Sequence, residues 1–304
     1  MDFKIGDEIE EVGNEETTSK LRIKSKLPII IVVILSLLVG FGVFFFSTKL
    51  FGDNKPKEPI TRQRLALNET NVEILYSYIT DEVDNKTREI FVKNSKVTLE
   101  TFTNQEKFDC ALQFAEPEDF EFDGKYKENE ITTIKQKIYV IPESKIRKYM
   151  VRFFGNKVTY KKDEEINHLF NFQINGNNYG TLKYSNKENG YETTFDRVNS
   201  PAIIKEIDDY YTELIDAYKE LDGTYTLEEK VIYPVAERTD MDNYTLTIYK
   251  DYEHKKMIEK KSNVTKEDLK KIDVKNYKSQ AATITYKFAL NGNVLYFESS
   301  SIKN

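Results

Sequence analysis

The sequence predicts an α+β protein: an N-terminal transmembrane helix followed by a domain of short helices packed on antiparallel meanders. Residues 27–46 carry no charge, which is the first observation. The second is that later segments alternate apolar and polar side chains around Asn-Gly or Asp-Gly pairs, the pattern of β-hairpins. The third is that segments such as Pro142–Gly155 repeat apolar residues every three or four positions, as amphipathic helices do.

The apolar stretch Lys26–Phe51 reads KLPIIIVVILSLLVGFGVFFFSTKLF. At about 1.5 Å per residue, its uncharged part forms a helix of about 30 Å, the thickness of a bilayer's hydrocarbon core. A cleavable signal would need a shorter apolar region and a small-residue cleavage site, and a helix in a soluble core is seldom apolar on every face. We therefore predict a retained helix, residues 27–46, that contacts membrane lipid.

Basic residues close to this helix predict its orientation. Lys20, Arg22, Lys24 and Lys26 precede it within a short distance, which favours a cytoplasmic N-terminus and an extracytoplasmic C-terminal part. The expected localisation is the cell membrane, as a single-pass protein. The predicted organisation is a cytoplasmic tail (1–26), the transmembrane helix (27–46), a linker (47–67), a first α+β module (68–199) and a second, mostly antiparallel module (200–304).

Charge and cysteine content limit the possible functions. The net charge is −6 at pH 7; the tail contributes 5 − 7 = −2, which leaves 40 − 44 = −4 for residues 47–304. So small an excess gives no preference for a polyanion, and we expect no nucleic-acid partner. The one cysteine, Cys110, excludes an intramolecular disulfide. Its helical spacing with Phe108 and Leu112 predicts a buried thiol.

Three helices are predicted in the first module. Thr70 is a candidate cap for a helix that follows it, and Thr103 and Glu106 have the spacing of a capping box. Pro142 to Gly155 reads as a helix with proline in its first turn and glycine as its stop. Residues 131–141 have the alternating, β-branched character of a strand.

Hairpins are predicted further along the chain. Residues 168–174 lead to Asn175-Gly176, the preferred type I′ turn, and strands at 179–184 and 191–197 complete a meander. Residues 202–221 fit either a helix or a hairpin arm at Tyr210–Glu220, and we favour the hairpin slightly. Phe170–Asn177 also resembles Tyr286–Asn293, so the domain could contain a duplicated unit or the same turn chemistry twice.

One segment has the spacing of a calcium loop. The EF-hand layout needs carboxylates at positions 1, 3, 5 and 12 and glycine at position 6. These positions hold Asp119, Glu121, Asp123, Glu130 and Gly124. Three features depart from the layout: Glu at position 3, Lys127 at position 9, and Pro117 where a helix should enter. We favour an acidic, solvated turn and keep calcium as the alternative; no other cofactor is predicted.

No catalytic residue is predicted, because no nucleophile elbow, zincin, P-loop or dinucleotide pattern is present. His168 alternates with core positions and His254 lies among charged residues; neither has a His or Cys at ligand spacing. Lys250–Lys278 has a balance of 10 − 6 = +4. We expect it to be a solvated surface, with contact to anionic wall polymer or lipid headgroups as the alternative.

This order of tail, basic cluster, single span, linker, helices and Tyr/Phe-rich meanders resembles single-pass exported proteins, themselves uncharacterised, of low-GC Gram-positive bacteria and their wall-less relatives. A helix on a curved meander also resembles nuclear-transport-factor-2-like or cystatin-like folds, a resemblance that transfers no catalytic residues. The sequence thus predicts a membrane-tethered, non-enzymatic extracytoplasmic binding module for a cell-envelope component, peptide or partner protein. The alternatives are an enzyme acting on envelope polymer through carboxylates, and a sensor or assembly subunit of a membrane complex.

Overall fold

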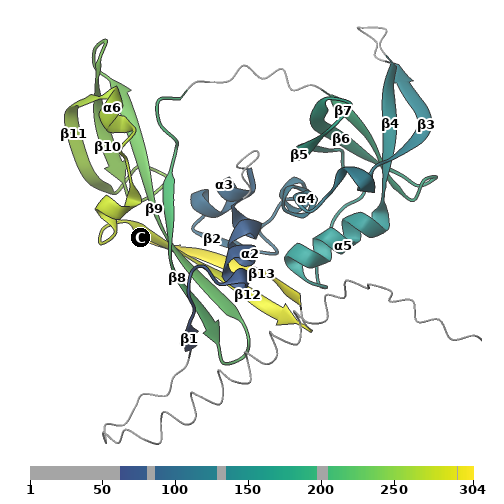
Figure 1. Ribbon diagram of the computed structural model, residues 1–304, viewed down its shortest axis with the longest axis horizontal. Coiled ribbons are helices and arrows are strands. Elements are labelled where there is room, and N and C mark those ends of the chain that lie inside the picture. The colour runs from purple at the N-terminus through teal and green to yellow at the C-terminus, as the bar shows by residue number, and fades with distance from the viewer. Residues whose placement is uncertain (1–61, 81–85, 129–134, 197–204, 293) are drawn as a thin grey trace, which may run out of the picture. The chain divides into compact units, whose positions relative to one another are not determined.

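The computed structural model describes residues 62–80, 86–128, 135–196, 205–292 and 294–304 (Figure 1). The predicted transmembrane helix lies outside these ranges. Within them, no helix combines the length and the hydropathy that crossing a bilayer requires. The described elements form an α+β fold with mostly antiparallel sheets, as predicted. Their contacts place Ile60–Asn304 in one compact unit.

The larger sheet has eight strands among the described residues, with a main path of β1-β8-β9-β12-β13-β2. Strand β9 also pairs with β10, which pairs with β11, so this hairpin extends the sheet beyond the main path. The strands are β1 (Arg62–Arg64), β2 (Lys96–Thr98), β8 (Tyr211–Glu220), β9 (Tyr225–Arg238), β10 (Asn243–Tyr249), β11 (Met257–Thr265), β12 (Ala282–Asn291) and β13 (Val294–Lys303).

The smaller sheet has five described strands in the antiparallel order β3-β4-β7-β6-β5. They are β3 (Glu121–Glu128), β4 (Lys135–Pro142), β5 (Ile166–Ile174), β6 (Asn177–Ser185) and β7 (Gly190–Asp196). The predicted hairpin between β5 and β6 is confirmed. Asn175 and Gly176 have φ of 53° and 79°, and a type I′ turn requires positive φ at both positions.

The helices are α2 (Thr70–Ile79), α3 (Lys86–Lys93), α4 (Asn104–Leu112), α5 (Glu143–Phe154) and α6 (Lys266–Leu269), with 3₁₀ turns η1 (Pro117–Asp119) and η2 (Val274–Tyr277). Helix α4 starts at the predicted capping box: the Glu106 N–H donates to the Thr103 hydroxyl at 3.2 Å, and the Thr103 N–H donates to the Glu106 carboxylate at 2.7 Å. Helix α5 buries the predicted face, Ile146, Tyr149, Met150, Phe153 and Phe154.

The structure decides between the two interpretations of residues 202–221 over the part it describes. Tyr211–Glu220 is strand β8, which pairs antiparallel with β9, so the hairpin is confirmed. Thr70 does not cap α2: Glu69 occupies the cap position and makes no side-chain capping bond. Strand pairing also crosses the predicted module boundary at residue 200, because β2 pairs with β13. Strand β1 lies within the predicted linker and pairs with β8.

One core cluster joins the helices to both sheets. At its centre the Phe91 ring lies 5.7 Å from Tyr286 of β12 and 5.1 Å from Phe297 of β13. Cys110 is fully buried, as predicted. A second cluster, which includes Ile232 and Leu246, lies between β9, β10 and the α6–η2 region. The two similar Asn-Gly segments form hairpins in different sheets, and their common origin stays a prediction.

Candidate functional site

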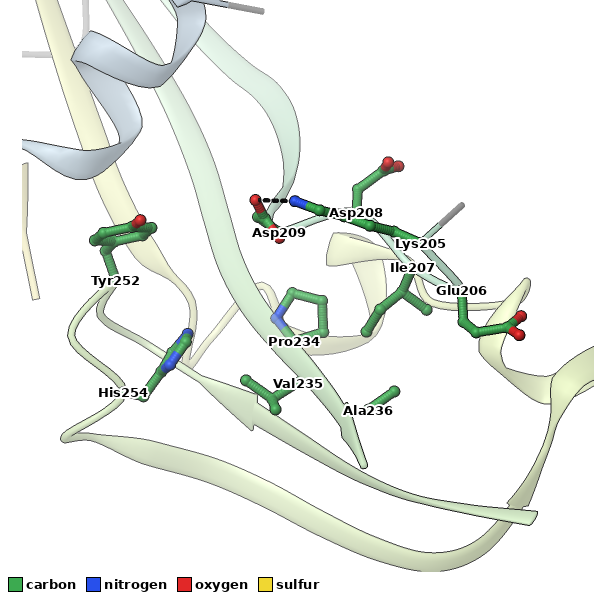
Figure 2. A pocket seen from close by; sticks show the side chains of 10 residues that line it. All are labelled: Lys205, Glu206, Ile207, Asp208, Asp209, Pro234, Val235, Ala236, Tyr252 and His254. Atoms are coloured by element: carbon green, nitrogen blue, oxygen red, sulfur yellow. Dashed lines mark hydrogen bonds and ion pairs between the residues drawn. The ribbon is translucent and has the colours of Figure 1, made fainter. Parts of the chain in front are cut away.

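A pocket of about 570 Å³ lies where β9 continues beyond its partner β8 (Figure 2). The β8–β9 ladder ends at the pair Tyr211 and Ile232, and the β9–β12 ladder ends at Val231. From Tyr233 to Arg238, β10 is the only described strand that pairs with β9. One edge of β9 therefore has no strand neighbour here among the described residues, and Pro234–Ala236 from this part of β9 line the pocket.

Pro234 suits a strand that has lost one neighbour. Proline has no backbone N–H to donate, so within sheets it is confined to unpaired edges, strand starts and bulges. Residues 205–209, which precede β8, line the pocket without forming a strand. Figure 2 shows them across from Pro234, Val235 and Ala236. Pairing between β8 and β9 thus ends at Ile232 while β9 continues to Arg238, and the pocket lies beside this continuation.

Carboxylates dominate the wall formed by residues 205–209. With Glu206, Asp208, Asp209 and Lys205, the charge of the lining is 1 − 3 = −2. Lys205 Nζ pairs with Asp209 at 2.7 Å, and Lys266 Nζ, from α6, pairs with Glu206 at 2.7 Å. The hydrogen bond from Lys266 lowers the pKa of the Glu206 carboxyl. Asp208 is exposed, and among the described residues no ion pair reaches its carboxylate.

The opposite wall is aromatic. Tyr252 is 38% exposed, and the His254 ring lies 4.8 Å from the Tyr249 ring. The Lys93 ammonium lies 5.2 Å from the centre of the Tyr252 ring, so this wall already attracts one cation. The turn that carries both side chains is held by Asp251, whose carboxylate accepts the N–H groups of Lys255 and Lys256. The aromatic wall is therefore positioned by hydrogen bonds between the Asp251 carboxylate and backbone N–H groups of the turn.

These features suit the binding of an extended chain. The pocket is open to solvent, and its carboxylates lie on an exposed segment. An unpaired edge beside a groove can accept an extended chain as an additional strand. The Asp208 carboxylate, which has no described ion pair, and the exposed rings of Tyr252 and His254 then favour Lys or Arg side chains on the added strand.

The predicted calcium-loop residues that the structure describes lie in η1 and in strand β3, whose pairing with β4 is irregular between Phe122 and Tyr126. Residues 121–128 form strand β3, which keeps Glu121 exposed. The Asp119 carboxylate accepts hydrogen bonds from Lys145, at 2.7 Å, and from Tyr149. Asp123 pairs with Lys125 at 2.8 Å. Among the described residues no group of three or more His, Cys, Asp or Glu side chains is placed to hold a metal.

Glu130, the twelfth position of that layout, lies outside the described residues. The calcium site therefore stays a prediction, although two of its oxygen donors already have lysine partners. For Asp119, burial raises the pKa, but the hydrogen bonds from Lys145 and Tyr149 outweigh burial and lower it. The ionised carboxylate thus stabilises the contact between η1 and α5.

A buried ionic cluster joins α2, α3, β9 and β12. Glu229 is fully buried, and its carboxylate accepts from Arg88, from Tyr76 at 2.5 Å and from Tyr286 at 2.7 Å. Arg88, which is 4% exposed, also donates to the Tyr286 hydroxyl at 2.7 Å. Burial raises the pKa of the Tyr76 and Tyr286 hydroxyls. The cluster's groups satisfy one another, and all but the partly buried Tyr76 are removed from solvent, which indicates a structural role.

The two histidines have the predicted structural or surface positions. His168 is 2% exposed, and its Nδ1 lies 3.0 Å from the buried carboxylate of Asp109 on α4. Gln105 donates to the same carboxylate and to the Asn167 carbonyl, so the network holds α4 against β5. His254 is exposed, with φ of 57°, on the aromatic wall of the pocket.

Local ion pairs occupy most lysines of the predicted basic segment 250–278. Each of these lysines contacts a carboxylate: Lys255, Lys261, Lys266, Lys270, Lys271 and Lys278. Most of these partners are near in sequence and exposed, so the segment matches the predicted solvated surface.

No family model, curated protein or solved structure matches this chain. The sequence offered two signals that point to the site without identifying it. One is Pro234 inside a strand-like run, and the other is the acidic cluster of Glu206, Asp208 and Asp209 just before a strand.

Proposed function

We propose that this protein is a membrane-tethered, extracytoplasmic interaction module that binds an extended, basic segment of a partner protein. The observation that carries the proposal is the unpaired edge of β9 from Tyr233 to Arg238, beside the pocket. A segment added to this edge gains backbone hydrogen bonds independent of its sequence, except at Pro234, which has no N–H to donate. Its Lys or Arg side chains can reach Asp208 on one side and the rings of Tyr252 and His254 on the other.

The tether belongs to the same proposal. The uncharged run 27–46 has the length of a bilayer span, and the basic residues before it favour an extracytoplasmic domain. Helix α5 packs on β4 and β7, which supports the expected helix-on-meander arrangement of nuclear-transport-factor-2-like or cystatin-like folds. These resemblances, and the duplication, remain proposals beyond the α+β architecture. Binding of a cell-envelope component other than a peptide would be a less specific version of the same proposal.

The test is capture of the protein by immobilised decapeptides that carry Lys or Arg at alternate positions, with Glu-containing peptides as the negative set. We expect binding to a subset of the basic peptides, because alternate side chains of an added strand face the same wall. The Asp208→Lys variant should weaken this binding at least tenfold, since it reverses the charge of the carboxylate that lacks a described ion pair.

Asp163→Lys is the matched control, because Asp163 is also exposed, is remote in sequence from the pocket and has no described ion pair. It should leave capture unchanged. Equal loss of capture in both variants would indicate a general charge effect and would contradict the proposed site. Equal capture of basic and acidic peptides would contradict the proposed ligand class.

A further inference from the structure

One end of the larger sheet exposes apolar side chains together. Leu221, in the β8–β9 turn, is 81% exposed, and Leu290 and Val294, beside the β12–β13 turn, are 46% and 49% exposed. The two turns are adjacent: a Cβ built on Gly223 would lie 3.5 Å from Leu290 Cδ2. We call Leu221, Leu290, Val294 and Ile74 the turn-end surface; Ile74, on α2, is 44% exposed.

A groove continues this surface between α2, α5 and β13. It has a volume of about 440 Å³ and is lined by Ile74 and Val294 together with Lys148 and Arg152 of α5. Both basic side chains are exposed. Lys287, the β12 residue three positions before Leu290, is exposed as well. The turn-end surface thus combines protruding apolar groups with flanking cations, the combination that binds the interface of an anionic bilayer.

The chain enters the fold at this same end. Arg62, the first residue of β1, pairs with Glu220, the residue immediately before Leu221. Between the predicted membrane helix and Arg62 lie 61 − 46 = 15 residues. A chain of that length reaches at most about 50 Å when extended and spans about 20 Å on average as a flexible coil. The entry point is therefore tethered close to the bilayer, where even weak contacts are populated.

We propose that the turn-end surface binds the lipid bilayer that anchors the protein, with Leu221, Leu290 and Val294 reaching its headgroup region. The carboxylates at the tip are held locally by neutral donors and keep their charge, so the flanking cations Lys148, Arg152 and Lys287 have to offset them. The Asp222 carboxylate accepts the N–H and hydroxyl of Thr224, and Glu220 accepts the hydroxyl of Thr226. The opposite end of β9, with the peptide pocket, then projects away from the membrane into the space where a partner is available.

The length of β9 supplies a matched control. Strand β9 has 14 residues and so spans about 43 Å. Leu221 precedes it and Met241 follows it, and the two side chains are similarly exposed, at 81% and 84%. The native Cys110 is fully buried, so a cysteine introduced at either position can be labelled alone, with the unsubstituted protein as the labelling blank.

The experiment uses the full chain reconstituted into phosphatidylcholine vesicles with and without phosphatidylglycerol. An environment-sensitive fluorophore is attached to Leu221→Cys or to Met241→Cys, and brominated lipids serve as quenchers. We expect the label at 221 to lose most of its fluorescence, more so with phosphatidylglycerol, and the label at 241 to keep it. In a Leu221→Cys chain that also carries Leu290→Asp and Val294→Asp, quenching at 221 should disappear while the circular dichroism spectrum is retained.

This inference rests on the anchor proposed above, and the two can fail separately. Release of the chain from the vesicles by alkaline carbonate would overturn the anchor. A retained chain with no quenching at 221, or with equal quenching at 221 and 241, would overturn the turn-end surface as the lipid contact. Disulfide-linked dimers of Leu221→Cys without quenching would assign the surface to a second copy of the chain and would also overturn the proposal.

Discussion

Removing one member of the buried Arg88–Glu229 pair should destabilise the fold more than removing the charge from both. In Arg88→Leu the Glu229 carboxylate keeps only the hydroxyls of Tyr76 and Tyr286 as donors, at a site with no solvent exposure. In Glu229→Gln the Arg88 guanidinium keeps its charge without its counterion. Each single variant should lose about 3–5 kcal/mol of unfolding free energy, the usual cost of an uncompensated buried charge.

The double variant Arg88→Leu/Glu229→Gln buries no charge, and its amide can still bond both tyrosine hydroxyls. It should be more stable than either single variant, with a coupling energy of about 3 kcal/mol. The assay is urea unfolding of residues 60–304 followed by far-ultraviolet circular dichroism, since the chain contains no tryptophan. The partly exposed pair Arg62–Glu228, whose charged atoms are 3.8 Å apart, is the control and should couple by less than about 1 kcal/mol. Additive losses at Arg88 and Glu229 would refute the reasoning.

Three further predictions concern local contacts. Because the folded-state pKa of Asp119 is lowered, its ionised form stabilises the fold above the unfolded pKa of about 3.9, and this contribution is lost as pH falls through the folded value. The unfolding free energy should therefore fall more steeply in acid for the native chain than for Asp119→Asn. Parallel curves for the two proteins would contradict this. Thr103→Ala should cost about 1 kcal/mol through loss of its cap, whereas Thr70→Ala, which removes none, should be near neutral in the same urea assay. Gly155→Ala should lower the melting temperature more than Gly176→Ala. Both positions have positive φ, but only at 155 would the added Cβ lie 2.9 Å from the Tyr296 ring. Equal losses would show that the contact with Tyr296 does not contribute.

Local sequence patterns predicted the elements whose causes are local. The buried face of α5, the capping box of α4 and the Asn175-Gly176 turn each depend on residues within a few positions of one another, and each is confirmed. The hairpin at Asp222-Gly223 was harder to predict because its strand β8 also fits a helical period. Pairing with β9 decides between the two structures, and only the fold supplies that pairing.

Long-range contacts were not predictable from one sequence. Arginine is usually found at the surface, yet Arg88 is buried because it pairs with Glu229. The two residues are 141 positions apart in the chain, so no local pattern predicts their contact. The same limit applies to the pocket. Pro234 and the acidic cluster around Asp208 are separate signals in the sequence, and they line one site only because β8 ends while β9 continues. The spacing of the calcium layout likewise did not predict that Glu121 and Asp123 belong to strand β3.

The central claim is that backbone hydrogen bonds to the open edge of β9 bind the partner. The most direct measurement is calorimetric titration with the tightest basic decapeptide, compared with copies in which successive backbone nitrogens carry methyl groups. Methylation preserves side chains and charge but removes the N–H donors that an added strand needs. We predict that methylation at alternate positions abolishes binding and that methylation at the positions between them does not. Equal affinity for every methylated copy would show that side chains alone bind, and would contradict the account.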